Sequence, residues 1–226
     1  EINGVVPQNA GTFVQATTSS GLKSNALQFS AWTNKQAGSR SHGLGASVVR
    51  DGKIYVFGGG ILSQSTRCES YDPETNQWTE FTTMPDKRSG AGTVFYNDEM
   101  YFVGGLERQL DGSLDEYTDI IKYSFTTNAW STLPGAVPNP GFCAAAELDG
   151  RIYVFGGNST DESTISKDIY TYDPKTGDFT ENGEMDIPRF KHTAITFGAS
   201  IYIFGGITSD GSENSGVATA TIFNGT

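Results

Sequence analysis

The stretch Ile54-Tyr55-Val56-Phe57-Gly58-Gly59 decides the fold, because an aromatic-rich strand that runs directly into a glycine pair occurs four times in this 226-residue chain. The other three copies are Met100-Tyr101-Phe102-Val103-Gly104-Gly105, Ile152-Tyr153-Val154-Phe155-Gly156-Gly157 and Ile201-Tyr202-Ile203-Phe204-Gly205-Gly206. Their glycine pairs follow one another at steps of 46, 52 and 49 residues, counted from Gly58 to Gly104, Gly156 and Gly205. A repeat of this length is typical of propeller blades and too long for a unit of two helices.

Each copy extends on both sides of its glycine pair. In the first copy, Gly45-Ala46-Ser47-Val48-Val49 leads into Asp51-Gly52, and Asp149-Gly150 repeats this turn in the third copy. Such dipeptides tolerate the positive φ angles of a two-residue hairpin turn. Beyond the glycines, a tyrosine is followed seven residues later by a second large aromatic residue, in the pairs Tyr71 and Trp78, Tyr123 and Trp130, and Tyr172 and Phe179. The repeat unit therefore predicts one four-stranded antiparallel sheet.

These features together resemble the kelch repeat: an arginine before the first strand, Asp-Gly in the turn, the glycine pair, and tyrosine followed by tryptophan. The resemblance covers roughly residues 40–226 and implies an all-β fold, a kelch-type β-propeller of four-stranded antiparallel blades. We expect one domain over residues 1–226, with an extension at 1–39 and repeats at about 40–82, 83–134, 135–183 and 184–226. The paired aromatic residues are expected between blades, and the glycines where backbones approach closely.

The phase of the repeat leaves the closure of the ring open. The fourth copy stops at Phe223-Asn224, which aligns with Tyr71-Asp72, so its last strand is missing. Residues 26–32 precede Arg40 much as Trp78 precedes Arg88, and the simplest expectation is that this amino-terminal strand completes the last blade. The alternatives are a fifth blade built partly from residues 1–24, with 11–17 as one strand, or a fragment of a larger propeller.

Composition limits the classes of partner. The net charge of −11 and a sequence pI near 4.5 argue against nucleic acid and anionic membranes, which both need a basic face. No apolar run approaches the ~18 residues that membrane insertion needs. Cys68 and Cys143 fall two blades apart, which predicts unbridged thiols and favours the cytoplasm. The sequon Asn158-Ser159-Thr160 and a lysine-poor surface instead favour an extracellular or periplasmic location, which we take as the expectation.

Function must be sought in the loops, because the repeat itself builds only the scaffold. The loop at 106–118 is the longest and most charged of those that follow a glycine pair. The candidate binding residues of this loop face are Glu107, Arg108, Asp111, Asp115 and Glu116, with Asp161, Glu162, Asp210 and Glu213 completing an acidic rim. The alternative is that all of these are solvated hairpin tips. Calcium is an alternative cofactor, because the Asp-Gly-Ser runs at 111–113 and 210–212 offer closely spaced oxygens, but neither has EF-hand spacing, and no cofactor is expected.

A second set of candidates lies in the connections between blades. These residues are Arg40, Arg88 and Arg189, with His42 and His192 a few residues later. Their placement before the innermost strand predicts that they surround the mouth of the central channel. The resemblance to kelch proteins implies that arginines there bind carboxylates or acidic peptide segments. The alternative is that they fix the blades by bonding loop carbonyls or neighbouring acids.

The sequence thus favours a non-catalytic recognition module that binds a protein or a glycan, with no catalytic residue and no metal. The alternative is a carbohydrate-active enzyme of the sugar epimerase or copper radical oxidase kind. A copper site of that type needs two imidazoles as well as tyrosine ligands. His42 and His192 are the only histidines in the chain, and the repeat accounts for them as equivalent positions without a metal.

Overall fold

The computed structural model describes residues 12–14, 27–29, 34–60, 64–160, 164–209 and 214–225. The chain divides into two compact units, Glu1–Ala37 and Gly38–Thr226. In the first unit, β1 (Thr12–Val14) pairs antiparallel with β2 (Leu27–Phe29). Every named element is a β-strand. Within these described ranges no helix is long and apolar enough to cross a bilayer.

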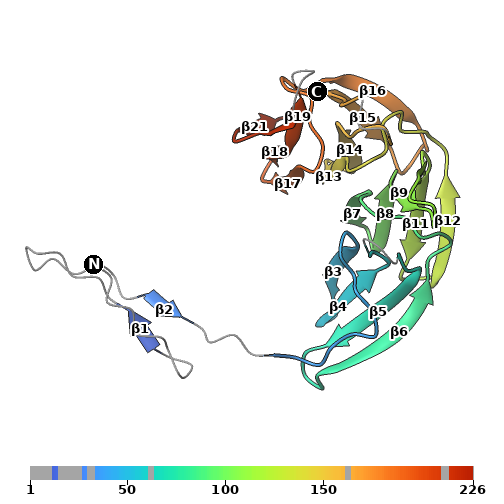
Figure 1. Ribbon diagram of the computed structural model, residues 1–226, viewed down its shortest axis with the longest axis vertical. Helices are drawn as coiled ribbons and strands as arrows, with labels where there is room; N and C mark the ends of the chain where they lie inside the picture. The colour runs from blue at the N-terminus through green and yellow to red at the C-terminus, as the bar shows by residue number, and fades with distance from the viewer. Residues whose placement is uncertain are drawn as a thin grey trace, which may run out of the picture. The chain divides into compact units, whose positions relative to one another are not determined.

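The second unit consists of four antiparallel sheets that follow one another along an arc (Figure 1). Blade 1 contains β3 (Ala46–Arg50), β4 (Lys53–Phe57), β5 (Arg67–Asp72) and β6 (Gln77–Thr83). Blade 2 contains β7 (Gly92–Tyr96), β8 (Glu99–Val103), β11 (Ile120–Ser124) and β12 (Ala129–Leu133). Blade 3 contains β13 (Ala144–Leu148), β14 (Arg151–Phe155), β15 (Asp168–Tyr172) and β16 (Phe179–Glu184). Blade 4 contains β17 (Thr193–Phe197), β18 (Ser200–Phe204) and β21 (Ala220–Phe223).

Two small hairpins follow the glycine pairs of blades 2 and 4. They are β9 (Leu106–Arg108) with β10 (Leu114–Glu116), and β19 (Ile207–Ser209) with β20 (Asn214–Gly216). The predicted all-β propeller of antiparallel blades is confirmed, with four blades among the described residues.

The turns have the predicted geometry. Asp51 and Gly52 have φ angles of 49° and 75°, and Asp149 and Gly150 have angles of 52° and 80°. Two consecutive positive φ angles define the tight turn whose twist matches that of the two strands it joins. The turn dipeptides therefore fix the register of the inner hairpins β3–β4 and β13–β14.

The aromatic pairs lie directly opposite each other on the two outer strands of each complete blade. The register pairs Tyr71 with Trp78, Tyr123 with Trp130, and Tyr172 with Phe179. The rings of the first two pairs have centroid separations of 5.1 Å and 5.2 Å. The constant spacing in the sequence is thus a constant cross-strand contact, which stabilises the sheet by packing.

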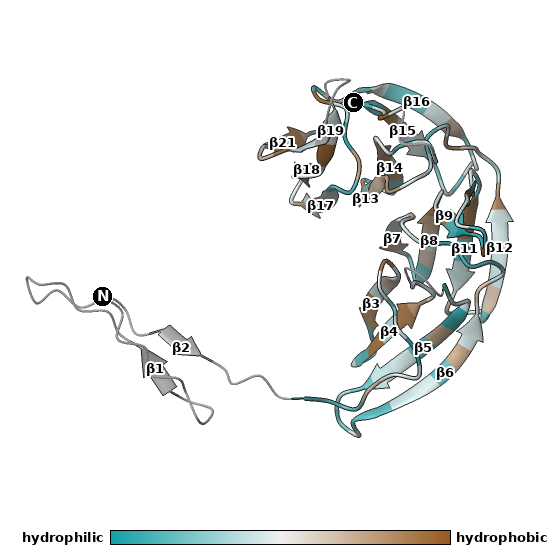
Figure 2. Ribbon diagram, in the orientation of Figure 1, coloured by the Kyte–Doolittle hydropathy of each residue, from teal (hydrophilic) through white to brown (hydrophobic). Residues whose placement is uncertain are grey.

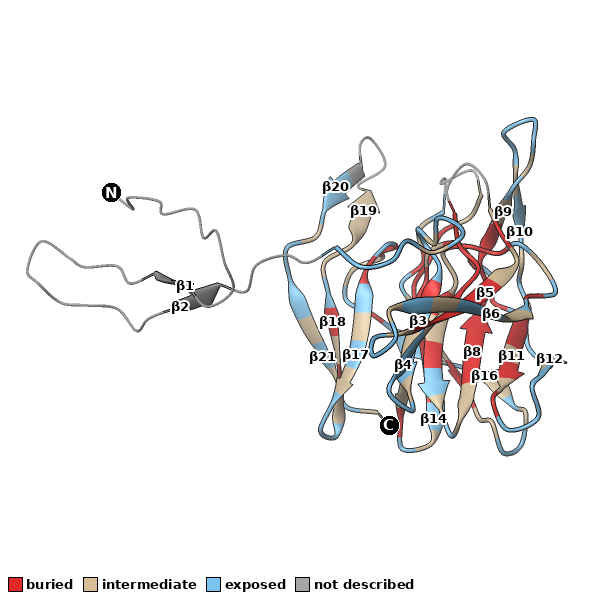
Figure 3. Ribbon diagram, turned by 90° about the horizontal axis from the view of Figure 1, so that it is seen from below, coloured by how far each residue is buried: buried red, intermediate tan, exposed pale blue. Residues whose placement is uncertain are grey.

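The core of the protein lies between successive blades. Between blades 1 and 2, the ring of Phe57 meets the rings of Phe102 and Tyr123 at centroid distances of 5.4 Å and 5.8 Å. Equivalent apolar clusters join blade 2 to blade 3 and blade 3 to blade 4. Strand β8 is accordingly buried at four of its five residues and β11 at three of five, and both are largely red in Figure 3. The outermost strands, such as β6 and β16, are mainly polar (Figure 2).

A ladder of backbone hydrogen bonds also joins the blades. Leu44, Gly90, Phe142 and Lys191 each precede an inner strand by two residues and have φ angles of 61°, 62°, 52° and 54°. The amide of each of the last three donates to the carbonyl of the one before, at 3.2 Å, 2.9 Å and 3.0 Å. Leu44, Phe142 and Lys191 therefore hold a left-handed conformation that non-glycine residues seldom adopt.

The glycine pairs lie where backbones approach closely, as predicted. Gly59 has φ +85°, and a Cβ atom there would be 2.7 Å from the backbone nitrogen of Gly45. Gly206 has φ +98°, and its Cβ would be 2.9 Å from the carbonyl oxygen of Phe190. Both the backbone conformation and the available space therefore require glycine.

The amino-terminal strand that was expected to complete the last blade lies in the first unit. In the first unit β2 pairs with β1, and blade 4 has three strands among the described residues. Completion of the last blade by residues 26–32 stays a prediction, as do the fifth blade and the larger propeller.

Candidate functional site

The β9–β10 hairpin projects beyond the sheets on one face of the propeller, which we call the loop face (Figure 3). Its strands pair Arg108 with Leu114 and Leu106 with Glu116. At the tip, the Gln109 amide donates to the Ser113 carbonyl at 2.8 Å, and Gly112 turns the chain with φ +92°. The predicted binding loop is thus an ordered hairpin.

The base of this hairpin rests on a buried arginine. Arg88 is 2% exposed, and its guanidinium donates to Asp86 at 2.7 Å and to Asp119 at 2.9 Å. The guanidinium carbon lies 4.6 Å from the centre of the Tyr117 ring, whose hydroxyl donates to Glu107. Burial and this bond to Glu107 raise the pKa of Tyr117 above its usual range. These contacts couple the hairpin to the body of blade 2.

The predicted acidic residues of the hairpin each accept a hydrogen bond within the protein. Asp111 accepts from the amide and hydroxyl of Ser113, which lowers the pKa of that carboxyl. Asp115 accepts from the Gln109 side chain at 2.6 Å. Glu116 accepts from the Thr160 amide at 2.7 Å, and Glu107 accepts from Tyr117. These carboxylates therefore shape the hairpin as well as charge its surface.

A fully exposed residue of the hairpin, Leu110, was not among the sequence candidates. Leu110 is 109% exposed at the tip, beside the exposed Arg108. The signal that could have found it is an apolar residue between the polar Gln109 and the Asp111-Gly112 turn. The other acidic candidates, Asp161, Glu162, Asp210 and Glu213, lie outside the described residues.

The channel-mouth candidates do not align as the sequence suggested. Three side chains bond the carbonyl of the first glycine of their own pair: His42 to Gly58 at 2.8 Å, Arg88 to Gly104 at 3.1 Å, and Arg189 to Gly205 at 3.2 Å. His42 thus stands where the other two blades have arginine, because all three residues lie 16 positions before that glycine. Arg40 lies two residues earlier and is exposed, so the expected alignment of Arg40 with Arg88 was wrong.

Arg189 differs from Arg88 in its partners. It is 1% exposed, and it bonds the carbonyls of Ile187 and Gly205 but no carboxylate among the described residues. Burial lowers the pKa of Arg189, and the charge of Asp186 opposes this shift. Both buried arginines therefore bind loop carbonyls, which is the structural role that the sequence left as an alternative.

His192 occupies a different place from His42. It directly precedes β17, at the position held by Gly45, Ala91 and Cys143 in the other blades. The residue is 8% exposed, and neither ring nitrogen has a hydrogen-bond partner among the described residues. Burial, assisted by the charge of Arg189, lowers the pKa of His192 to about 4, against a smaller opposing effect of the Phe155 carbonyl. The expected equivalence of the two histidines was therefore wrong.

Small side chains surround the ring of His192. It lines a hollow of about 170 Å³ between β7, β13 and β17, together with Ala91, Cys143 and Ala145. His42 does not line this hollow. Across the part of the chain that the structure describes, no group of three His, Cys, Asp or Glu side chains is arranged to hold a metal ion.

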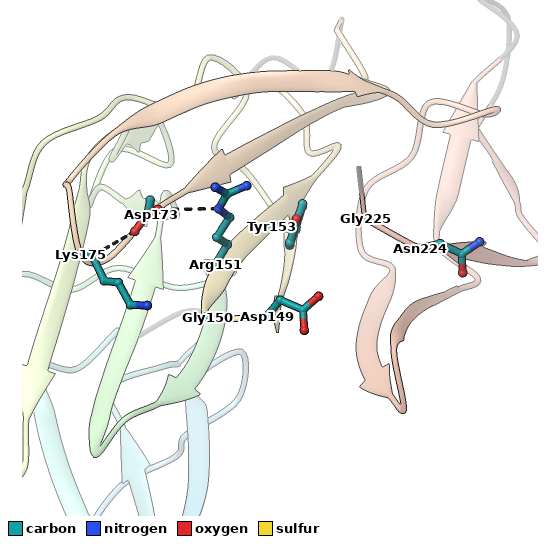
Figure 4. A pocket seen from close by; sticks show the side chains of 8 residues that line it. All are labelled: Asp149, Gly150, Arg151, Tyr153, Asp173, Lys175, Asn224 and Gly225. Atoms are coloured by element: carbon teal, nitrogen blue, oxygen red, sulfur yellow. Dashed lines mark hydrogen bonds and ion pairs between the residues drawn. The ribbon is translucent and has the colours of Figure 1, made fainter.

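A larger, polar groove of about 450 Å³ lies at the β13–β14 turn (Figure 4). Arg151 projects into it, and its Nε atom lies 3.6 Å from Asp173. Lys175, Asp149 and Asn224 also line it. The β13–β14 turn is at the opposite end of the sheets from the β9–β10 hairpin (Figure 3).

Two further sequence features have a structural explanation. Cys68 and Cys143 are free and buried, and burial raises their pKa values to about 12 and about 11, so both thiols are poor nucleophiles.

Asn158 of the sequon is 1% exposed and forms β-bridges with Gly141 and Ile165. Asn158 lies in the segment between β14 and β15, outside any named strand, but its side chain is buried, so the folded protein leaves no room for a glycan on it.

Comparison with known proteins agrees with this architecture. The family model of the Attractin/LZTR1 β-propeller matches residues 10–224. Beta-scruin of Limulus polyphemus is 30% identical over 193 residues, which are 80% of this chain and 20% of that protein. The Kelch-like protein terF of Aspergillus terreus is 27% identical over 74% of this chain and 38% of that protein. The chain thus spans well under half of either relative.

A solved structure, that of YjhT, superposes with a TM-score of 0.65 at 17% sequence identity, over 83% of this chain and 66% of that one. At this identity the match shows the fold alone. With its four repeats, cross-strand aromatic pairs and paired glycines, the chain belongs to the Attractin/LZTR1 β-propeller family of kelch-repeat proteins.

Proposed function

We propose that this propeller is a non-catalytic recognition module that binds another protein through its loop face. The observation that carries the proposal is the β9–β10 hairpin, which holds the fully exposed Leu110 at its tip beside Arg108. Arginine is enriched among the side chains that contribute most to binding at protein interfaces, and the exposed Leu110 two positions later offers apolar area for a partner to cover.

The base of the hairpin supports the same proposal. Arg88, Asp86 and Asp119 hold the base together, and the Arg108 amide donates to Gln64 at 2.6 Å. A loop that is already ordered loses less conformational entropy on binding, so more of the contact energy contributes to affinity. The hairpin is therefore suited to recognition before any partner arrives.

An enzymatic alternative receives less support from the described residues. A catalytic site would bring histidine, arginine and a carboxylate to one pocket. His192 lines a hollow of small residues, while the Nε2 atom of His42 is bonded to Glu69 at 2.9 Å. These two histidines therefore do not line the same pocket.

A glycan ligand is a second candidate, and the polar groove at the β13–β14 turn favours it. Arg151, Asp173 and Asn224 place donors and acceptors around a volume that could hold a sugar ring. Glycan-array binding that is lost in Asp173→Ala and retained in Leu110→Ser would support this groove as the ligand site.

The test of protein binding is site-specific photo-crosslinking. A benzophenone amino acid replaces Leu110 in one variant and Thr127, at the exposed β11–β12 turn on the opposite face, in a matched control. We expect a discrete adduct from a native extract with position 110 and none with position 127. The adduct is then identified by mass spectrometry.

Direct binding of the identified partner completes the test. Leu110→Ser is expected to weaken its affinity by at least about tenfold, or about 1.4 kcal/mol, while Thr127→Ser leaves it unchanged. Equal crosslinking at the two positions, or unchanged affinity of Leu110→Ser, would contradict the proposal.

A further inference from the structure

We propose that His42 is a pH-responsive latch in blade 1, which fastens residues 39–45 to the glycine pair and to β5 when its imidazole is doubly protonated. This role is separate from recognition through the β9–β10 hairpin.

The latch is visible in the contacts of the ring. Nδ1 of His42 lies 2.8 Å from the carbonyl oxygen of Gly58, and Nε2 lies 2.9 Å from a carboxylate oxygen of Glu69. The other oxygen of Glu69 accepts from the Ser39 amide at 3.3 Å. The His42 carbonyl in turn accepts from the Gly45 amide at 3.0 Å. One ring thus connects two loops and a strand.

The chemistry of these partners determines the protonation state that satisfies them. A backbone carbonyl only accepts hydrogen bonds, and so does an ionised carboxylate. A neutral imidazole has one N–H donor, so it satisfies Gly58 or Glu69 but not both. Only the doubly protonated ring donates to both, and its bond to the carboxylate is then charge-assisted.

Glu69 is suited to remain ionised. It is 3% exposed, and although burial acts to raise its pKa, the hydrogen bonds from His42 and Ser39 outweigh this effect and lower the pKa. A buried carboxylate needs such a partner, because an unpaired charge in the interior is costly. Deprotonation of His42 therefore leaves Glu69 without a bonded cation among the described residues, and it leaves either Gly58 or Glu69 without its hydrogen bond.

The other charged groups near the latch have their own partners or lie at the surface. From β5 and β6, Arg67 and Glu80 form an ion pair at 3.1 Å, and Arg67 also donates to the hydroxyl of Ser39 at 3.3 Å. From the segment itself, Arg40 is exposed. The neutral ring of Trp78 stacks on His42 at a centroid distance of 6.3 Å. Glu69 is therefore the carboxylate that bonds His42.

The repeat supplies an internal comparison. Arg88 and Arg189 make the equivalent bond in blades 2 and 4, and a guanidinium stays charged at every pH at which the protein is folded. Histidine is the side chain that changes charge between about pH 5 and 8. In blade 1 the side chain that bonds the first glycine of the pair can therefore lose its charge, whereas the equivalent arginines of blades 2 and 4 cannot.

The sign of the pH dependence follows from the two partners. The contact needs a doubly protonated His42, so it is lost when rising pH removes the second proton of the ring. It also needs an ionised Glu69, whose pKa is lowered, so it is lost only at strongly acidic pH. The latch is therefore expected to close toward acidic pH and to open toward alkaline pH.

Amide hydrogen exchange tests this proposal in the intact protein. The protection factors of Ser39 and Gly45, corrected for intrinsic exchange rates, are measured at pH 6 and pH 8. We expect both to fall about tenfold at pH 8. The control is Ser89, whose amide donates to Leu106 at 2.9 Å next to the permanently charged Arg88, and its protection should stay constant.

Two variants separate the latch from a merely structural contact. His42→Arg should keep Ser39 and Gly45 protected at both pH values. In Glu69→Gln, the side-chain amide can donate to a neutral imidazole, so the pH dependence should disappear although the shape of the side chain is kept. Equal protection of the wild-type amides at the two pH values would overturn the proposal, and so would an unchanged pH dependence in Glu69→Gln.

Imidazole nitrogen spectra give a readout that needs no stable variant at position 42. The protein has two histidines, and replacing His192 with asparagine assigns the signals. His42 should carry protons on both ring nitrogens at pH 6 and on one at pH 8. A ring in the same state at both pH values would rule out the latch.

Discussion

At the scale of single residues, one position of the repeat links neighbouring blades through its backbone carbonyl while its side chain varies. His42, Arg88 and Arg189 share this position, and blade 3 has Pro140 there. The carbonyls of Pro140 and Arg189 accept from Gly105 and Gly157 of the preceding blade, at 2.9 Å and 3.0 Å. This backbone link does not depend on the side chain, so the side chain is free to be an arginine, a histidine or a proline.

Removal of the buried guanidinium in blade 2 should be costly. Arg88→Met leaves Asp86 and Asp119 without their cation and the Gly104 carbonyl without its donor, so we expect a loss of about 2 to 4 kcal/mol in the free energy of unfolding. Arg151→Met is the control, because Arg151 is exposed and lies 3.6 Å from Asp173, and it should change stability by less than about 0.5 kcal/mol. Urea denaturation measures both. Similar values for the two variants would contradict this account.

The buried His192 gives the stability of the protein a dependence on pH. Its pKa is lowered from 6.5 in the unfolded chain to about 4 in the folded protein. Between these two pH values the unfolded chain binds a proton that the folded protein does not bind. The resulting stability is present above about pH 6.5 and is lost as pH falls toward 4, with a magnitude on the order of 3 kcal/mol. The difference in unfolding free energy between wild type and His192→Gln, measured from pH 7 to pH 4, isolates this effect. A difference that does not vary with pH would show that His192 titrates alike in both states.

At the scale of elements, the glycine pair and the strand it ends act as one unit. The pair turns the chain with positive φ angles, and the same turn brings it against the start of the inner strand, as Gly59 lies against Gly45. Gly59 must therefore both hold a positive φ angle and leave room for a neighbouring backbone, and only glycine does both. This explains why the glycine pair is kept in all four copies.

A matched pair of substitutions separates conformation from space. Gly59 has φ +85° with backbone atoms within 2.8 Å of an added Cβ, whereas Gly183 has φ +88° with nothing within 4 Å. Gly183→Ala should cost about 1 to 2 kcal/mol, the left-handed penalty alone. Gly59→Ala carries the same penalty plus a backbone clash, so we expect a loss larger by at least about 2 kcal/mol. Equal losses in thermal or chemical unfolding would mean that the close approach relaxes at no cost.

The sequence predicted those parts of the fold that depend on spacing along one strand or hairpin. The turn dipeptides and the pairing of Tyr71 with Trp78 follow from local geometry, so counting residues was sufficient. The alignment of His42 with Arg88 also follows from counting, 16 positions back from the glycine, but it was missed because residue type was used to align the copies. The burial of Asn158 could not be predicted, because it depends on contact with Gly141 before the inner strand.

At the scale of the whole propeller, stability depends on how many faces of each sheet are covered. Among the described residues of the second unit, blades 2 and 3 each contribute to two apolar clusters, whereas blades 1 and 4 each contribute to one. Large apolar side chains of blade 4, Ile195, Phe197, Phe204 and Ile222, are accordingly 45% to 76% exposed. In an array of repeats, each unit is stabilised mainly by its neighbours.

This difference predicts a gradient of local stability along the chain. Opening blade 4 exposes one interface, whereas opening blade 2 or 3 exposes two, so amides of β18 should exchange faster than the equivalent amides of β8 and β14. We expect at least about a tenfold difference in protection, equivalent to about 1.4 kcal/mol, between residues at matched positions such as Ile203 and Val154. Both are buried in the central strand of their sheet, at 1% and 0% exposure, so solvent access in the folded state does not separate them. Hydrogen exchange at neutral pH measures this difference in one sample. Equal protection of β18 and β14 would mean that the four blades open as a single cooperative unit and that the exposed face of blade 4 has no cost in local stability.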